Sequence, residues 1–403
     1  MRLCDIVDGY EYHASAPGKI MWLGAYALLN KPYTSLVTTV TARAHAYIKQ
    51  SENNSVIIRV PQFEKSAKGV IAGDGRVEIS VPDELTLVKT AIEVAVRYSI
   101  ARGKTARGFD IETVTDPQFE YTLTGGGSRS TLSKSGLGSS AAVTVAAIAA
   151  VLKFMDINHS ENDALHKLAQ LAHAMATGKI GSGFDIAAAI HGNMIYERFS
   201  PSIIKDFPAD YTNQQLLSVI AAEWDHKLSG IRLPESLKLI FANFIGKSAS
   251  TVSLVSQVNK FRDKDPEKYS EIMKRINEQT EAAYKYLADA SKGMDNDTLK
   301  SSLQETFKRS RALTKELGML SGADLESDEC TELIEKSLEH GGFLVRLPGA
   351  GGKDAIAALC LNDEDKRRLE EYWKQDNRLR ILDIDFNDSG VMVEANKTSE
   401  GRA

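Results

Sequence analysis

The sequence predicts an α+β protein, and three features of its 403 residues lead to that prediction. From Ile6 to Ile111 the chain consists mostly of short β-like runs, such as "NSVIIRVPQF" and "GRVEISVP", separated by Asn, Asp, Gly and Pro. A long uncharged helix follows near the middle of the chain. The second half then alternates charged amphipathic helices with short apolar strands, which is typical of an α+β sandwich.

In the first half, one helix is expected to interrupt the strands at residues 84–103. The Gly- and Ser-rich segment 124–140 is too polar for a core and is interpreted as a long loop that leads into the uncharged helix. A further helix should begin after Ser160 and end at Gly178, because it has acidic residues in its first turn and a glycine after its last. A short helix at 186–192 and a strand at 193–200 come next.

Residues 208–235 have a loop-like composition, and a new strand at 237–244 opens the second half. We therefore predict two domains, residues 1–235 and 236–403. Long charged helices are expected at 266–289 and 298–320, and a glycine-rich segment lies between apolar runs at 341–361. A helix at 363–377 and a strand at 379–386 should close the domain.

Composition excludes several classes of protein. The net charge of -5 leaves no general electrostatic attraction to nucleic acid. Cys4, Cys330 and Cys360 lie far apart, without the paired spacing of a zinc site, so a reduced, cytoplasmic protein is expected. No apolar window is long enough for a membrane span, and the N-terminus lacks the apolar core of a secretion signal. The sequence does not reveal the oligomeric state.

The stretch "KSGLGSSAAVTVAAIAAVL", residues 134–152, has the features of a phosphate site at the start of a buried helix. Gly136 and Gly138 let backbone amides approach an anion, Ser139 and Ser140 add hydroxyls, and the helix dipole favours negative charge there. Residues 141–152 are apolar apart from Thr144, so every face of the helix should be buried. Taken alone, the stretch is equally consistent with Ser139 as a simple N-cap.

Other phosphate motifs fit less well. A Walker loop needs a glycine five positions before its Gly-Lys-Ser/Thr, and the two Gly-Lys pairs have Tyr98 and Phe241 there. "GLGSSA" matches a loose dinucleotide fingerprint, but the polar residues before it do not predict the strand that an oxidoreductase would need.

Three other segments carry candidate groups. "GKIGSGFD" contains Lys179 and Asp185, although Asp185 is also placed to be a helix N-cap. In "SAPGKIMWLGAY", Lys19 precedes apolar residues and is expected at the start of a buried strand. "LPGAGGKDA", at 347–355, follows an apolar strand and provides another loop that a ligand can approach closely.

Together and in this order, "SAPGKIMWLGAYALL", "GLGSSAA" and "LPGAGGKD" resemble the three motifs of the GHMP kinase superfamily. The family usually has a longer glycine run where this chain has Lys353. The resemblance implies an N-terminal half like domain 2 of ribosomal protein S5, a ferredoxin-like C-terminal half and an active site between them.

Within the superfamily, the resemblance is closest to the phosphomevalonate kinases. They commonly have a Gly-x-Tyr pattern like Gly24-Ala25-Tyr26, and "GKIGSGFDIAAAI" resembles their aspartate loop. Mevalonate kinases carry a magnesium-binding glutamate where this chain has Ala174. The resemblance implies ATP, Mg²⁺ and phosphorylation of (R)-5-phosphomevalonate to (R)-5-diphosphomevalonate. A mevalonate kinase, another small-molecule kinase of the superfamily, and a regulatory protein that only binds nucleotide are the alternatives.

The resemblance also implies roles for individual residues. Lys19 and Asp185 are the candidate catalytic residues, with Asp185 acting either as a base or by orienting groups. The candidate ATP-binding residues are Lys89, Lys134, Ser135, Gly136, Leu137, Gly138, Ser139 and Ser140; Ser139 or Ser140 is expected to reach the metal. The candidate acceptor-binding residues are Lys19, Tyr26, Lys179, Ser182, Gly183, Asp185, Gly349, Ala350 and Gly351. Arg43 is a weaker candidate for offsetting the charge of two anions.

Overall fold

The computed structural model describes residues 9–123, 131–157, 162–246, 251–290 and 296–396. Its largest element is a mixed sheet with the central strand order β10-β9-β2-β6-β3-β4-β5, to which β1, β15 and β16 also pair. The strands of this sheet are β1 (Tyr12–Leu23), β2 (Thr34–Gln50), β3 (Ser55–Val60), β4 (Lys65–Ile71), β5 (Val77–Glu78), β6 (Phe109–Thr115), β9 (Met194–Glu197), β10 (Lys227–Gly230), β15 (Phe386–Asn387) and β16 (Met392–Ala395).

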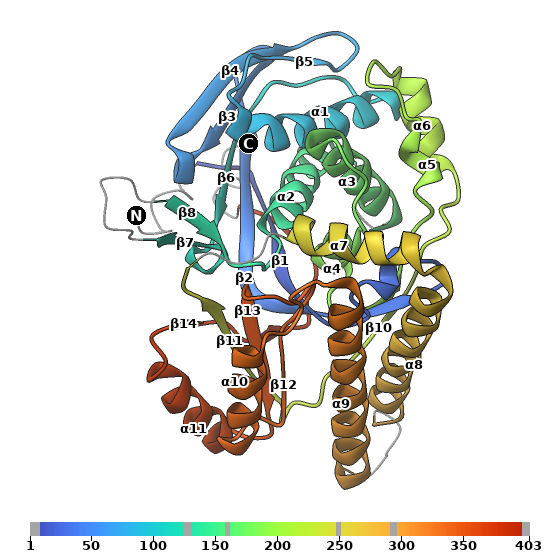
Figure 1. Cartoon of the computed structure of the whole chain (residues 1–403). Helices are drawn as coiled ribbons and strands as arrows, with labels where there is room; N and C mark the ends of the chain where they lie inside the picture. Colours follow the sequence, from blue (N-terminus) through green and yellow to red (C-terminus); the bar gives the residue numbers. More distant parts are fainter. Residues whose placement is uncertain (1–8, 124–130, 158–161, 247–250, 291–295, 397–403) are drawn as a thin grey trace.

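Helices α1, α2 and α3 pack together against this sheet (Figure 1). No side chain from 141 to 152 is more than 8% exposed, which confirms the prediction of a fully buried helix in α2. The helices of the first half are α1 (Thr86–Ala101), α2 (Ser139–Phe154), α3 (Asn162–Thr177), α4 (Phe184–His191), α5 (Ser202–Lys205) and α6 (Asn213–Ala221). Gly178 has φ 68 after the end of α3, as a helix-ending glycine requires, whereas Ser160 lies outside the described residues.

Two segments of the first half that were expected to be loops contain regular structure. Part of the polar segment before α2 is a strand, β8 (Thr131–Lys134), which pairs antiparallel with β7 (Glu120–Leu123). This isolated hairpin is not the parallel strand of a dinucleotide-binding unit. The loop-like stretch 208–235 contains α6, which a Thr212–Gln215 capping box starts.

The second half contains a four-stranded antiparallel sheet in the order β12-β13-β11-β14. With helices between β11 and β12 and between β13 and β14, this order is that of a ferredoxin-like fold and confirms the predicted class. The strands are β11 (Lys238–Phe244), β12 (Leu344–Arg346), β13 (Ala355–Cys360) and β14 (Leu379–Leu382), and the helices are α7 (Thr251–Lys264), α8 (Pro266–Ala290), α9 (Asn296–Ser321), α10 (Asp328–Glu339) and α11 (Asp363–Lys374).

The chain returns to the first half after β14, because β15 pairs with β2 and β16 pairs with β1. The boundary at residue 235 stays a prediction. Helices α8 and α9 lie side by side below the large sheet, and α7 crosses in front of α4 (Figure 1). Among the described helices, none combines the length and the hydrophobicity that a membrane crossing needs.

Candidate active site

Strand β1 places Lys19 at the centre of the site. The strand begins at Tyr12, so the expectation that Lys19 starts a strand is wrong: Lys19 lies in its second half. The β1–β2 register shifts between Pro17 and Lys19 and again between Met21 and Leu23. Such irregularities redirect side chains and backbone groups. Between them β1 still pairs with β2 along one edge, and along its other edge it bonds to the loops at Leu137 and Gly349.

The glycine loop before α2 is attached to Lys19 twice. The Lys19 backbone amide donates to the Leu137 carbonyl at 2.9 Å, and its ammonium donates to the Gly136 carbonyl at 2.7 Å. Gly138, with φ 86, is the N-cap of α2, and a Cβ atom there would lie 3.1 Å from Lys19 Cε. Only glycine allows this approach in this backbone conformation.

Neither helix start has a side-chain cap. Ser139 is the first residue of α2 and not its N-cap, and Gly183 rather than Asp185 is the N-cap of α4. The two N-cap alternatives are therefore wrong. Because no side chain caps α2, its first amides remain free to face an anion.

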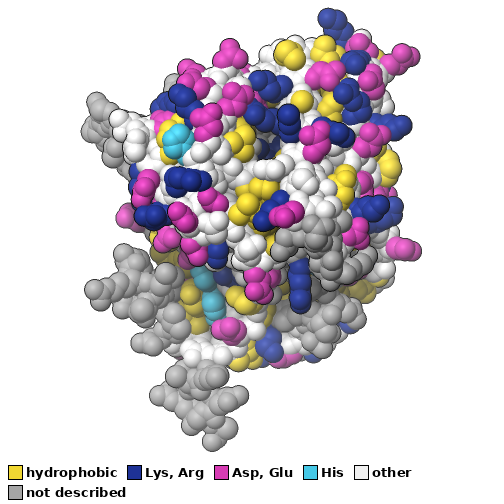
Figure 2. Space-filling model, turned by 90° about the horizontal axis from the view of Figure 1, so that it is seen from below, with side chains coloured by type: hydrophobic (Ala, Val, Ile, Leu, Met, Phe, Trp, Pro, Cys, Tyr) yellow, Lys and Arg dark blue, Asp and Glu magenta, His cyan; other side chains and the backbone are white. Residues whose placement is uncertain are grey.

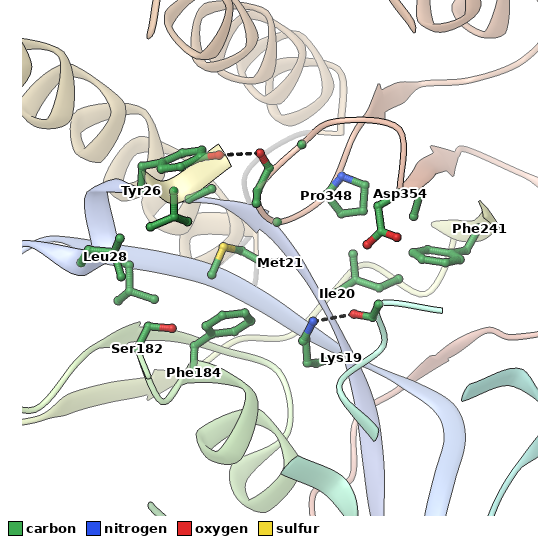
Figure 3. A pocket seen from close by; sticks show the side chains of 18 residues that line it. Lys19, Ile20, Met21, Tyr26, Leu28, Ser182, Phe184, Phe241, Pro348 and Asp354 are labelled. Atoms are coloured by element: carbon green, nitrogen blue, oxygen red, sulfur yellow. Dashed lines mark hydrogen bonds between the residues drawn. The ribbon is translucent and has the colours of Figure 1, made fainter. Parts of the chain in front are cut away.

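Asp185 lies in the first turn of α4 and faces the other loop. A Cβ atom on Gly138 would lie 3.8 Å from Asp185 Cβ, so Lys19, Gly138 and Asp185 meet at one point. The Phe184 ring lies 5.2 Å from the Lys19 ammonium and contacts it as a cation–π pair (Figure 3).

The late glycine loop closes the site from the second half. The Gly349 amide donates to the Met21 carbonyl at 3.2 Å, and the Tyr26 hydroxyl donates to the Ala350 carbonyl at 2.8 Å (Figure 3). Asp354 follows this loop, and its Oδ2 would lie 3.1 Å from a Cβ atom on Gly136. All the motifs that were singled out in the sequence therefore meet around β1.

Burial and neighbouring charges act in opposite directions on the pKa values of Lys19 and Asp354. Burial lowers the pKa of the Lys19 ammonium, and the carboxylates of Asp185 and Asp354 act in the opposite direction. Burial raises the pKa of Asp354, which Lys19 opposes. The two carboxylates therefore favour the charged form of the ammonium against the cost of its burial.

Two adjoining cavities open here. The smaller, of about 240 Å³, includes Lys19, Tyr26, Ser182, Phe184, Gly349, Ala350, Gly351 and Asp354 in its lining (Figure 3). The larger, of about 890 Å³, lies between α3, the loop before α4 and α7, and its lining includes Ser140, His173, Lys179, Ser182, Gly183, Asp185 and Lys260. Ser182 and Val255 line both. Every candidate acceptor-binding residue thus lines at least one cavity.

Several candidate residues lie elsewhere. Lys89 pairs with Glu93 on α1 at 2.6 Å and lines neither cavity. Arg43 is buried against Ser15 and the Gly390 carbonyl. The Ser135 hydroxyl is buried and donates to the Phe119 carbonyl at 3.0 Å, and the Leu137 side chain is in the core. The Lys134 side chain lies outside the described part of the chain.

Two groups in contact with the site, Asp354 and His173, were not predicted from the sequence. Asp354 stands directly after the glycine loop, but only its neighbour Lys353 was singled out in the sequence, as a departure from the glycine run of the family. His173 lies on α3 with Nε2 3.2 Å from the Ser140 hydroxyl. The local sequence around His173 does not indicate that its partner is a serine on another helix. Within the described residues, no group of three or more His, Cys, Asp or Glu is arranged to hold a metal ion.

Comparisons with known proteins show the family of the chain. Residues 87–193 match the N-terminal domain of the GHMP kinases, and residues 299–378 match their C-terminal domain. The chain is 30% identical to the phosphomevalonate kinase of Candida albicans, over 94% of this chain and 97% of that protein. It is 26% identical to "Phosphomevalonate kinase, peroxisomal" of Arabidopsis thaliana, over 95% and 96%.

The fold is also that of a solved relative. Streptococcus pneumoniae phosphomevalonate kinase, in complex with phosphomevalonate and AMPPNP, aligns with a TM-score of 0.72 at 18% identity, covering 93% of this chain and 99% of that one.

Proposed function

We propose that this chain, which belongs to the GHMP kinases, transfers the γ-phosphoryl group of ATP to (R)-5-phosphomevalonate and produces (R)-5-diphosphomevalonate. The observation that carries the proposal is the convergence of Lys19, the uncapped start of α2 and Asp185 beside two cavities. Phosphoryl transfer requires mainly positioning and charge stabilisation, and these groups supply both.

The phosphates of ATP bind at the loop before α2. The amides of 136–140 donate to them, and the helix dipole favours their charge. Gly136 and Gly138 have positive φ and no side chain, so their backbone is open to such a ligand; a Cβ atom on either would make a tight contact of 3.1 Å, with Asp354 or with Lys19. Ser135 and the Leu137 side chain hold the loop in place from the core and do not touch the nucleotide.

The residues present fit a magnesium ion held largely by the nucleotide. Mg²⁺ in such sites usually keeps several waters and takes few protein ligands, which agrees with the hydroxyls of Ser139 and Ser140 beside the phosphate loop. When bound, the ion offsets the charge of the transferred phosphoryl group. His173 contacts the Ser140 hydroxyl and so fixes its direction at the edge of the larger cavity.

The acceptor occupies the cavities next to Lys19. Two unit anions 4 Å apart repel by about 4 kcal/mol at an effective dielectric constant of 20, so a cation between them is required. We assign this role to Lys19, which lines the smaller cavity, while Lys179 and Lys260 line the larger one. Tyr26, Ser182 and the loop 349–351 surround the remainder of the acceptor.

Asp185 orients groups and is not a general base in this reaction. A phosphomonoester has a second pKa of about 6 and is already ionised at neutral pH, so its oxygen needs no proton removed. The carboxylate lies beside the Lys19 chain at the start of α4, where it can hold the ammonium or an acceptor hydroxyl. The placement in the cytoplasm belongs to this proposal; Cys330 and Cys360 are free and buried, as a reducing compartment allows.

A coupled ADP-release assay with mevalonate and 5-phosphomevalonate in parallel tests the proposal. We expect turnover with 5-phosphomevalonate and little with mevalonate, because mevalonate lacks the phosphate that Lys19 compensates. Faster turnover of mevalonate would identify a mevalonate kinase instead. If the protein bound nucleotide but turned over no phosphorylated or free hydroxy acid, it would be a protein that only binds nucleotide.

A further inference from the structure

The loop before α4 carries acceptor-binding groups on a backbone that two buried side chains hold in place. The segment 178–183 contains three glycines, so its own conformational preference is weak. We propose that Gln170 and Arg198 are positioning residues that fix this loop, and with it Ser182 and Asp185, for phosphoryl transfer. The inference rests on the proposed function for its substrate, and on the geometry below for its residues.

Gln170 bonds to the end of the loop from α3. Its side chain is 5% exposed, and its amide donates to the Gly183 carbonyl at 2.8 Å. The same carbonyl accepts the first helical bond of α4, from the Ala187 amide at 3.0 Å. The Gln170 amide therefore sets the direction of the first turn of α4, in which Asp185 lies.

The fit between Gln170 and the loop is close. A Cβ atom on Gly183 would lie 2.7 Å from both the nitrogen and the oxygen of the Gln170 amide. Gly183 also has φ 80, which disfavours any other residue. The same Gln170 nitrogen also lies 3.4 Å from Nε2 of the buried His166, which further limits rotation of the amide.

Arg198 bonds to the middle of the loop from the end of β9. Its side chain is 6% exposed, and its guanidinium donates to the Gly181 carbonyl at 2.9 Å and to the Phe199 carbonyl at 3.3 Å. Among the described residues, the ionisable neighbour that acts on the Arg198 guanidinium is the Tyr196 hydroxyl and not a carboxylate. Gly181 and Phe199 both line the larger cavity, so a buried positive charge lies directly behind its wall.

Such a cation is costly to bury without a counter-ion, and burial lowers the pKa of Arg198. An anionic acceptor in the cavity reduces that cost, because the guanidinium then faces a negative charge across the loop. Arg198 thus positions the loop through Gly181 and adds positive potential to the acceptor cavity without touching the acceptor.

The test uses the full chain with Gln170→Met, which keeps side-chain length and removes both amide donors, and with Arg198→Met and Arg198→Lys. Lys167→Met is the matched control. Lys167 is also buried on α3 and donates to backbone carbonyls, those of Ile220 and Ala222, which are not part of the loop, and it pairs with Asp163.

We expect Gln170→Met and Arg198→Met to lower kcat/KM for 5-phosphomevalonate by about 100-fold, as small misplacements of reacting groups do, with KM for ATP unchanged. Arg198→Lys should recover part of the loss, since it keeps the charge. Lys167→Met should lower the Tm and leave kcat/KM unchanged. Hydrogen exchange followed by mass spectrometry should show faster exchange at 178–187 in the two Met variants, with exchange at 363–374 unchanged.

Wild-type exchange rates at 178–187 in both Met variants, or equal losses of kcat/KM in Lys167→Met, would overturn the inference. Failure of the proposed function has a different signature: the wild-type protein would not turn over 5-phosphomevalonate. The exchange measurement decides the positioning role in that case as well, because it requires no substrate.

Discussion

Two of the glycine loops of the site, those before α2 and α4, lead into buried helices in the same way but are held by different kinds of groups. Gly138 and Gly183 are both N-caps with positive φ, 86 and 80, and no side chain caps either helix. The loop before α2 is held by Lys19, which also faces the ligands. The loop before α4 is held by Gln170 and Arg198, which are buried behind it.

The comparison distinguishes a residue that holds a loop and also takes part in the reaction from residues that only hold a loop. At the loop before α2, removing the support also removes a charge from the reaction, so stability and catalysis change together. At the loop before α4, the supports can be altered while every group that touches a ligand stays present. Substitutions at the two loops should therefore differ in size and in the kinetic constant that they affect.

The largest effect is expected from Lys19→Ala, which removes the cation between the two anions and the bond to Gly136. We expect kcat to fall by about 1,000-fold, the upper end of the loss for one stabilising donor. Asp185→Asn should lose far less, because it keeps the size of an orienting group. Steady-state kinetics with 5-phosphomevalonate measure both.

If Asp185→Asn lowered kcat more than Lys19→Ala does, and if this loss grew at low pH, Asp185 would be a general base and not an orienting group.

Gly183→Ala should have the next largest effect. Its Cβ would lie 2.7 Å from the Gln170 amide, and φ 80 adds about 1–3 kcal/mol of backbone strain. We expect kcat/KM for the acceptor to fall by about 100-fold, since Asp185 is displaced. Gly178→Ala is the control: its φ is 68, and nothing lies within 4 Å of a Cβ there. It should lower the Tm and leave the kinetic constants unchanged.

Equal kinetic losses in both alanine variants would mean that backbone strain alone, and not contact with Gln170, accounts for the effect.

The pH dependence should show the lowered pKa of Lys19. Burial favours the neutral amine, so the ammonium is present below the lowered pKa and is lost as pH rises through it. We expect kcat/KM for the acceptor to decrease at alkaline pH, by about tenfold for each pH unit above that pKa, with a midpoint below the usual value of about 10.4. Rates measured from pH 7 to pH 11 test this.

Asp354→Asn sharpens the same measurement. The Asp354 carboxylate raises the pKa of Lys19, so its removal should move the alkaline decline to lower pH. A decline that begins at or above about 10.4 in the wild-type protein would contradict the desolvation of Lys19.

The smallest effect is expected at the late glycine loop. Tyr26→Phe removes the hydroxyl that donates to the Ala350 carbonyl at 2.8 Å. A lost hydrogen bond of this kind costs about 1 kcal/mol, or about fivefold in KM for the acceptor, with kcat unchanged. A change in kcat and not in KM would place Tyr26 in the chemical step.

The strongest sequence patterns predicted elements that the structure confirms. The uncharged run 141–152 became the buried helix α2, and the charged amphipathic stretches became α8 and α9. These patterns are local, because a continuous apolar or periodic stretch leaves few alternatives. Short elements were less predictable: β8 is polar and four residues long, and its stability depends on pairing with β7.

The site was partly predictable for the same reason. Lys19, Gly136, Gly138 and Asp185 stand in short glycine-containing segments whose composition already indicates close backbone approach. Arg43 and Lys89 do not stand in glycine-containing segments. In the structure Arg43 bonds to Ser15, and Lys89 pairs with Glu93. Gln170 and Arg198 had no local signal, since their partners are backbone carbonyls 13 and 17 residues away.

The sequence by itself determined the fold class, the buried helix α2 and the glycine segments that allow a phosphate to approach, because these depend on neighbouring residues. Only the tertiary structure decided that Lys19 contacts the loop before α2, that Asp354 faces Gly136, and that Gln170 and Arg198 hold the loop before α4. Each of these contacts joins different segments of the folded chain. Pairing in sheets and packing of helices, which depend on the whole chain, bring such segments together.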